Sequence, residues 1–413
     1  MADLPSENMY NILSTLTSKK RLQAAILPSE IMYDILSRMP VKSLARFRCV
    51  NKLWCNYIND PYLEAMHTKR PSVNDPVPIM FRQFPSDDHP NSPCTLSFLE
   101  HKEEAGICTL EVKKKPPVME FMCKSWTYRN PDNIVLGSCN GLLYSSKHSH
   151  DGNKLVVIHP LRKDCYESPP IKTPFHPQQQ QSCGIDLQES NRLCVEESSG
   201  LGFDDSTNTF KMVCVVKREH EGLLEDLYQL KEDLWTMVHV LGTDSWRKIP
   251  QVPSYPITGE GVFANGCLHW LISDEYDDYR AAYLGRPVIK FDIAKEEFGV
   301  IKPPHELPDY WVKEQLVDLH GEVGYVYQIF NHRMEVWVLK ERGWVMHCEF
   351  EQKPPLPGCL MKVLGFWNDD GDVLMTDNWK RQMFVYNLNS NSLHEVSLVG
   401  CEEGLTLIDI RMY

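Results

Sequence analysis

The chain has 413 residues, which is more than one ordinary domain needs and suits a small module joined to a large one. Hydrophobic residues make up 42% of it, so it can bury a sizeable core, which argues against global disorder. The net charge is −13, with +1 in residues 1–26 and +3 in residues 27–70, which leaves −17 for the rest. This acidic remainder argues against non-specific nucleic-acid binding, which needs a basic surface.

A partial repeat stands at the N-terminal end of the chain. Residues 4–14 repeat residues 27–37 with nine of eleven residues identical. The copy carries Asn8 where the second version has Ile31, and nothing that resembles the helix expected after residue 40 follows it. We interpret residues 1–22 as a flexible partial duplicate with no binding role of its own.

A first helix is expected to begin at residues 27–30, Leu-Pro-Ser-Glu, because proline is tolerated in a first helical turn and Glu30 complements the helix dipole. Ile31, Ile35 and Met39 follow at intervals of four residues, which is the spacing of one apolar helix face. Pro40 is expected to stop this helix.

A second, longer helix is expected from a start at residues 41–44 to an end at residues 59–61, Asn-Asp-Pro. Phe47, Val50, Trp54 and Ile58 would form one apolar stripe along it. About 35 residues are too few to bury this apolar surface alone. Either the following domain or a separate protein must therefore cover it.

The residues of this segment resemble a known motif. The matching positions are Leu27-Pro28, Ile35-Leu36, Met39-Pro40, Ser43-Leu44, Arg46-Phe47-Arg48, Val50, Lys52 and Trp54. In order and spacing they resemble the F-box, with Met39 where leucine is usual. The resemblance implies that residues 23–67 dock on a Skp-type adaptor, which bridges to a cullin. The contact role that it implies falls on Leu27, Pro28, Ile31, Ile35, Leu36, Pro40, Leu44, Phe47, Val50 and Trp54.

The remaining chain divides into a linker with the first strands, 68–119, and a large domain, 120–413. In the large domain short alternating strands are separated by turn signals. One recurring phrase is a turn that leads into a strand, because Asn and Gly tolerate the positive φ of hairpin turns. It occurs at Asn140-Gly141 and Asn265-Gly266, and in looser form at His320-Gly321 and Asp370-Gly371.

A second phrase is an apolar strand, a polar turn and then an aromatic or apolar residue. Its last positions from Trp246 onward are spaced by about 50 residues, the period of kelch-type propeller blades. The preceding interval is longer and contains two expected insertions, the glutamine tract 178–181 and the charged stretch 221–233. We expect five or six blades, with the apolar stretch after Gly404 as the strand that closes the domain.

This region also resembles a known family. The residues that carry the resemblance are Gly137–Leu143, Gly202–Asp205 with Phe210-Lys211, and Asn265–Leu271. They resemble the F-box-associated, kelch-repeat-like domain of plant F-box proteins, although Ile158-His159-Pro160 departs from the usual Trp-Asn-Pro. The expected fold is thus mainly β, with a small N-terminal α module of F-box helices followed by a kelch-like β-propeller. The resemblance implies the substrate-recognition subunit of an SCF-type ubiquitin ligase, which links an unknown target protein to the ligase.

The sequence contains no recognisable catalytic motif: it lacks a P-loop, a G-x-S-x-G elbow, an H-E-x-x-H pair and a dinucleotide fingerprint. The carboxylates at 274–278 lack the spacing of a calcium loop and predict an acidic surface loop. His269 is expected to be a packed blade residue. We therefore expect no catalytic residue, metal or cofactor. The alternatives to a ligase subunit are a propeller scaffold or a glycan-active propeller without a ligase role. Co-purification with a Skp-type adaptor would distinguish the ligase subunit from both.

Fourteen cysteines show no CxxC spacing, so no zinc knuckle is predicted, and reduced thiols in the cytoplasm and/or nucleus are the expectation. No apolar run approaches the roughly 20 residues of a membrane span, and the first residues do not resemble a signal peptide. We expect neither a membrane nor nucleic acid as a partner.

Overall fold

The computed structural model describes the elements of the chain and some of their connections. The described residues are 27–37, 39, 44, 47–60, 62–63, 66, 78–83, 94–104, 107–112, 119–121, 137–147, 154–159, 164–171, 195–218, 234–273, 285–304, 312–329, 333–351, 361–368, 370–377, 382–399 and 406–412. The chain forms two compact units, residues 1–59 and 60–413. No helix in the described ranges is long and apolar enough to cross a membrane.

The first unit contains two described helices, α2 (Ser29–Ser37) and α4 (Lys52–Asn59). Both predicted outer boundaries are confirmed, because α2 begins directly after Leu27-Pro28 and α4 ends at Asn59. The prediction of one continuous second helix is wrong. Leu44 and Phe47 are helical, near the predicted start, but residues 48–50 form a turn and Asn51 is not helical, so α4 is a separate helix that begins at Lys52.

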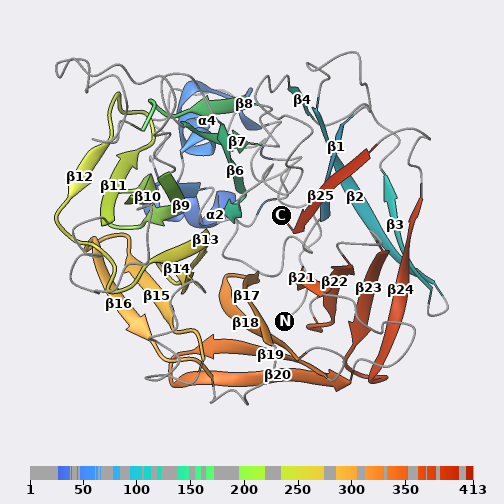
Figure 1. The fold of residues 1–413 in the computed structure, drawn as a ribbon. Coiled ribbons are helices and arrows are strands. Elements are labelled where there is room, and N and C mark those ends of the chain that lie inside the picture. Colours follow the sequence, from blue (N-terminus) through green and yellow to red (C-terminus); the bar gives the residue numbers. More distant parts are fainter. Residues whose placement is uncertain are drawn as a thin grey trace, which may run out of the picture. The chain divides into compact units, whose positions relative to one another are not determined.

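The second unit is built from strands that group, within the described residues, into six blades of a propeller (Figure 1). Blades 2 to 6 each contain four consecutive antiparallel strands. Blade 2 holds β5 (Gly137–Cys139), β6 (Leu142–Lys147), β7 (Lys154–His159) and β8 (Asp164–Glu167). Blade 3 holds β9 (Val195–Asp204), β10 (Thr209–Arg218), β11 (Leu234–Val240) and β12 (Arg247–Ile249).

Blades 4 to 6 continue the same order along the chain. Blade 4 holds β13 (Ile257–Ala264), β14 (Cys267–Ile272), β15 (Val288–Asp292) and β16 (Glu297–Ile301). Blade 5 holds β17 (Val312–Leu319), β18 (Glu322–Ile329), β19 (Arg333–Lys340) and β20 (Gly343–Glu351). Blade 6 holds β21 (Met361–Phe366), β22 (Val373–Asp377), β23 (Gln382–Asn387) and β24 (Ser392–Val399). The six blades agree with the upper value of the expected range.

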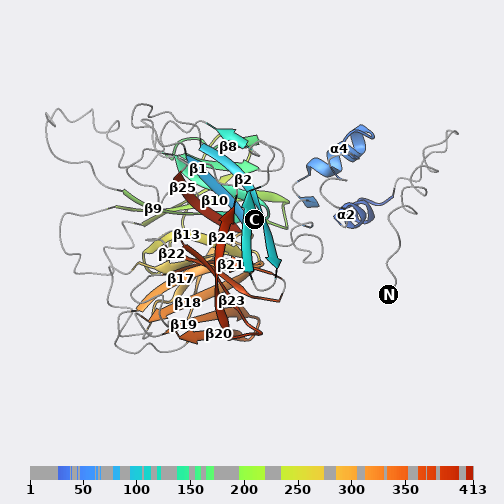
Figure 2. The same cartoon turned by 90° about the vertical axis from the view of Figure 1, so that its right-hand side faces the viewer.

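Blade 1 is assembled from both ends of the second unit. It combines β1 (Pro78–Gln83), β2 (Cys94–Glu104) and β3 (Ile107–Val112) with the last strand of the chain, β25 (Thr406–Met412). The short β4 (Met119–Phe121) pairs with β2 beside them. β25 lies antiparallel to β1, with Met412 opposite Pro78, and both views show the two strands side by side (Figure 2). The predicted closing role of the last strand is therefore confirmed.

The two recurring sequence phrases correspond to the two kinds of hairpin in a blade. Asn140-Gly141, Asn265-Gly266 and His320-Gly321 form the turns between the first and second strands, and all six residues have positive φ. The second phrase forms the hairpins between the third and fourth strands, such as β11–β12 and β15–β16. The glutamine tract 178–181 and the stretch 221–233 lie outside the described residues, between consecutive strands of the blade order.

Apolar side chains fill the spaces between neighbouring blades. One buried cluster runs through blades 2, 3 and 4 and includes Tyr144, Phe203 and Trp270. A second runs through blades 5 and 6 and includes Val326 and Phe384. Since each blade is too thin to bury both of its faces alone, these shared clusters make the ring the stable unit.

Candidate functional site

The start of α2 follows from its first residues. The amides of Ile31 and Met32 donate to the carbonyl of Pro28 at 3.0 and 3.1 Å, so the helix begins on the proline that the sequence places there. Glu30 lies in the first turn, where a negative charge opposes the positive end of the helix dipole. Ser37 ends the helix, and its hydroxyl donates to the carbonyl of Asp34 at 2.9 Å.

The two faces of α2 differ in exposure. Met32 and Leu36 are buried, Leu36 with 1% of its surface accessible. Ile31 and Ile35 on the other face are 46% and 37% exposed, and Leu27 just before the helix is 44% exposed. These three apolar side chains follow each other at four-residue intervals, so they define one exposed apolar stripe. We call Leu27, Ile31 and Ile35 the α2 stripe.

The position of α4 is determined by Asn51. The side-chain oxygen of Asn51 accepts a hydrogen bond from the backbone amide of Trp54 at 2.8 Å. This is the geometry of a helix N-cap, in which a polar side chain satisfies an otherwise unpaired amide of the first turn. The cap explains why the predicted long helix is interrupted: the asparagine lies between Val50 and Lys52 and starts a new helix there.

Aromatic pairs connect the residues of the helical unit. Phe47 and Trp54 meet edge to face with ring centroids 5.3 Å apart, and both are half-buried. Tyr33 of α2 and Tyr57 of α4 meet in the same way at 5.0 Å. Such contacts contribute about 0.5–1.5 kcal/mol each beyond the area that they bury. The Tyr33–Tyr57 pair joins α2 to α4, and the Phe47–Trp54 pair joins α4 to the segment before it.

The ten predicted adaptor contacts thus separate by exposure. Leu27, Pro28, Ile31, Ile35 and Val50 are exposed, Phe47 and Trp54 are half-buried, Leu36 and Leu44 are buried, and Pro40 lies outside the described residues. Sequence reasoning missed Leu53, a large apolar side chain on α4 that is 46% exposed. The break in the helix shifts its register and accounts for this omission.

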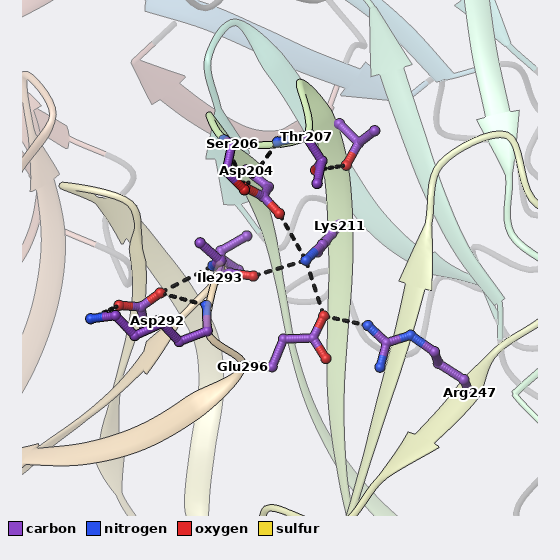
Figure 3. Close-up of polar contacts among 11 residues, drawn as sticks. Asp204, Ser206, Thr207, Lys211, Arg247, Asp292, Ile293 and Glu296 are labelled. Carbon is purple, nitrogen blue, oxygen red and sulfur yellow. Dashed lines mark hydrogen bonds and ion pairs between the residues drawn. The ribbon is translucent and has the colours of Figure 1, made fainter.

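A second site, made of charged residues, lies where the hairpins of blades 3 and 4 meet (Figure 3). The ammonium group of Lys211 is buried and contacts a carboxylate oxygen of Asp204 at 2.9 Å. It also reaches the carbonyl of Ile293 and the carboxylate of Glu296, each at 3.0 Å. Arg247 on β12 forms a further ion pair with Glu296. We call Asp204, Lys211, Arg247 and Glu296 the blade 3–4 network.

The residues Gly202–Asp205 and Phe210-Lys211, which carry the family resemblance, pack and hydrogen-bond around this network. Phe203 and Phe210 pack with centroids 4.8 Å apart across the hairpin. A Cβ at Gly202 would come within 2.6 Å of Ile293, so only glycine permits this approach of blade 4. Asp204 accepts hydrogen bonds from the amide and hydroxyl of Ser206, which shapes the turn.

The acidic groups of the network are held in the charged form. Burial alone would raise the pKa of Asp204, but hydrogen bonds from Ser206, Lys211 and Thr207 outweigh it and lower the pKa. Burial likewise raises the pKa of Glu296, and Arg247 and Lys211 lower it overall. The Lys211 ammonium nitrogen has three oxygen atoms of Asp204, Ile293 and Glu296 within 3.0 Å. The charged groups of the network thus pair with one another, which makes it a structural ion-pair site.

The described residues contain no group of three or more His, Cys, Asp or Glu side chains that would hold a metal ion. His269 is buried on β14, 3.2 Å from the carbonyl of Val262. The carboxylates at 274–278 lie outside the described residues.

Known protein families match both units. Residues 24–65 match the F-box domain, and residues 176–407 match the F-box associated beta propeller domain. The F-box/kelch-repeat protein At3g23880 of Arabidopsis thaliana is 23% identical over 374 residues, covering 89% of this chain and 90% of its own. The F-box protein CPR1 of the same plant is 26% identical over 389 residues, covering 88% and 82%.

Among solved structures, a lectin of Aleuria aurantia bound to a fucose-containing disaccharide covers 76% of this chain and 94% of its own. Its sequence identity is 8% and its TM-score is 0.37, values that support no conclusion about ligands.

The helical unit and the propeller together define an F-box protein. The propeller match spans more than half of the chain, so the chain belongs to the F-box associated beta propeller family. This organisation supports the general role of a substrate adaptor of SCF-type ligases, and members of the F-box family are typically non-catalytic adaptors.

Proposed function

We propose that this protein is the substrate-recognition subunit of an SCF-type ubiquitin ligase. The helical unit docks on a Skp-type adaptor, which connects it to a cullin, and the propeller holds the target protein. Ubiquitin transfer is left to other subunits, so the chain itself is not an enzyme. The observation that carries the proposal is the α2 stripe: three large apolar side chains, two in α2 and one just before it, stay exposed in the folded chain.

We propose different tasks for the predicted contact residues, based on how exposed each of them is. Leu27, Pro28, Ile31, Ile35 and Val50 contact the adaptor directly, and Leu53 joins them. Phe47 and Trp54 contact it with their exposed edges. Leu36 and Leu44 act from the interior by holding the helical unit in shape, because buried side chains offer no surface to a partner. Pro40 keeps the contact role that the F-box resemblance gives it.

The size of the exposed set fits a specific interface. Burying one large aliphatic side chain that starts half exposed contributes on the order of 1 kcal/mol at about 25 cal/mol per Å². Five such residues, Leu27, Ile31, Ile35, Val50 and Leu53, supply several kcal/mol before the costs of association. Central apolar anchors of an interface typically cost about 2 kcal/mol or more when truncated. The α2 stripe therefore suffices to make adaptor binding sensitive to single changes.

Target binding belongs to one end of the propeller. Within each blade the strands alternate in direction, so the connections from second to third strand and from blade to blade emerge at the same end. Three of these connections are long, namely 168–194, 219–233 and 273–287, whereas the opposite end carries short turns such as Asn140-Gly141. Binding surfaces are commonly built from loops on a rigid scaffold. We place the target contacts at the end with the long connections.

Co-purification tests the proposal. The full chain, produced with a Skp-type adaptor and a cullin, is expected to elute with both as a stoichiometric complex. A folded chain that elutes without the adaptor would overturn the ligase role and leave the alternative of a propeller scaffold. Replacing residues 219–233 by a short Gly-Ser turn is expected to keep adaptor binding and to change which proteins are ubiquitinated. We also propose a cytoplasmic or nuclear location, on the ground of the cysteine pattern alone.

A further inference from the structure

The C-terminal end of the chain contacts blade 1 on both of its edges. β25 pairs antiparallel with β1, with Met80 opposite Ile410. The preceding strand, β24 of blade 6, pairs in parallel with β3, with Cys108 opposite Val396 and Leu110 opposite Leu398. The strand order is therefore β21-β22-β23-β24-β3-β2-β1-β25. Strands β3, β2 and β1 lie between two consecutive strands from the other end of the second unit.

A shared core accompanies the β3–β24 pairing. Leu99, Cys108 and Leu110 of blade 1 are buried in one cluster with residues of blade 6. The blade 6 members include Trp367, Leu374 and Val396, all of which are buried. Blades 6 and 1 are thus joined by the parallel pairing of β24 with β3 and by a shared cluster of buried apolar side chains.

Other pairs of neighbouring blades are joined differently in the described part of the chain. The sheets of blades 3 and 4 meet through one parallel pair, Glu260 with Ser199, on their first strands. Blades 2 and 5 form separate four-stranded sheets. Among the described strands, pairing between the outermost strands of two blades occurs only where β24 meets β3.

We propose that the propeller is closed by two latches: an inner latch, β1–β25, and an outer latch, β3–β24. The outer latch holds blade 1 to blade 6 without the help of β25. Blade 1 is the first blade after the helical unit in the chain. The outer latch therefore keeps that unit attached to a closed ring when the last strand is released, and the ring does not depend on its C-terminal strand alone.

A disulfide across the outer latch tests this inference. Directly paired residues of neighbouring strands share a face and lie within disulfide reach, so Val396→Cys should couple to the native Cys108. Ser397→Cys is the matched control, because Ser397 is exposed and the next residue of a strand points to the opposite face. After oxidation of the folded chain with diamide, mass spectrometry should find the 108–396 linked peptide in the first variant and no 108–397 peptide in the control. Failure to find the first peptide would overturn the outer latch.

The second step removes the inner latch. A Val396→Cys chain that lacks residues 404–413 is expected to melt at a lower temperature than the full chain and still to form the 108–396 disulfide to a similar extent. Where this truncated chain does not fold, Ile410→Pro weakens the same β1–β25 pairing and replaces it in the test. Loss of the disulfide in a folded chain without a working inner latch would show that the outer latch depends on β25. Failure of both weakened chains to fold would likewise overturn the proposal.

Discussion

Asn51 and Trp54 determine where the second F-box helix starts, because the side-chain oxygen of Asn51 accepts the amide of Trp54 at 2.8 Å. With this cap in place, Trp54 packs against Phe47. Val50, which precedes Asn51, and Leu53, which follows it, remain exposed. A single polar residue within an apolar stripe thus decides which side chains of this unit are available to a partner.

Asn51→Ala should destabilise the helical unit by about 1 kcal/mol, the usual cost of losing a helix N-cap. The variant should show less helix by circular dichroism and bind a Skp-type adaptor several-fold more weakly. Asn56→Ala, an exposed change on the same helix, is the control and should leave both measurements unchanged. Equal behaviour of the two variants would show that the cap does not matter.

Lys211→Met should destabilise the propeller by about 3 kcal/mol or more, because it leaves Asp204 and Glu296 without their shared partner in a buried site. Denaturant unfolding of the full chain measures the change. Lys295→Met is the matched control: Lys295 pairs with Asp292 at 3.3 Å, but its side chain is 71% exposed, so the loss should stay below about 1 kcal/mol. Similar decreases in the free energy of unfolding of both variants would show that burial of the Lys211 ion pairs does not make them more stabilising than an exposed pair.

Stability should fall as the pH drops from 6.5 toward 4, in part because of His269. Burial lowers the pKa of His269 to about 4, and the nearby Lys290 adds to the effect, while a hydrogen bond to the Val262 carbonyl opposes it. The folded chain therefore keeps this ring neutral where the unfolded chain binds a proton. The shift of about 2.5 pH units corresponds to at most about 3 kcal/mol, fully present above pH 6.5 and lost progressively below it.

Denaturant unfolding between pH 7 and pH 4.5 checks this, with His269→Gln as the comparison. The variant should be less pH-dependent than the natural chain over this interval. Identical slopes for the two chains would show that His269 does not contribute.

Deletion of residues 1–22 should leave adaptor affinity within about 0.5 kcal/mol of the full chain, the usual range for changes away from a packed site. The reason lies in the sequence, since the copy of residues 27–37 puts Asn8 at the place of Ile31 in the α2 stripe and lacks a second helix. Titration calorimetry with purified adaptor decides. A clear loss of affinity would make the duplicate a working part of the interface.

Local patterns predicted the local structure well. The helix boundaries at Pro28 and Asn59 could be predicted from the sequence, because proline and the Asn-Asp-Pro sequence restrict the backbone of the residues next to them. The Asn-Gly turns were readable for the same reason, since positive φ is a property of single residues. The helix break at Asn51 was missed because the apolar period continues across it, and only the hydrogen bond to Trp54 reveals the cap.

Contacts between residues far apart in the chain could not be predicted from the sequence. The pairing of β24 with β3 joins residues almost 300 positions apart, and nothing local specifies the partner of an outer strand. Lys211 and Glu296 lie 85 positions apart and meet only because two blades are neighbours. Spacing also did not separate buried Leu36 from exposed Ile35, because periodicity defines a face of a helix and not what covers it.

The central claim is that the α2 stripe binds the adaptor, and affinity measurement on one pair of variants tests it most directly. Ile31→Ser with Ile35→Ser removes two exposed apolar side chains whose loss should leave the fold intact. Truncated anchors cost about 2 kcal/mol or more, so the affinity for a Skp-type adaptor should fall by at least about 30-fold. Asn56→Ser, with an unchanged melting temperature in both chains, is the control and should bind normally. A folded Ile31→Ser, Ile35→Ser chain that binds the adaptor with unchanged affinity would contradict the account.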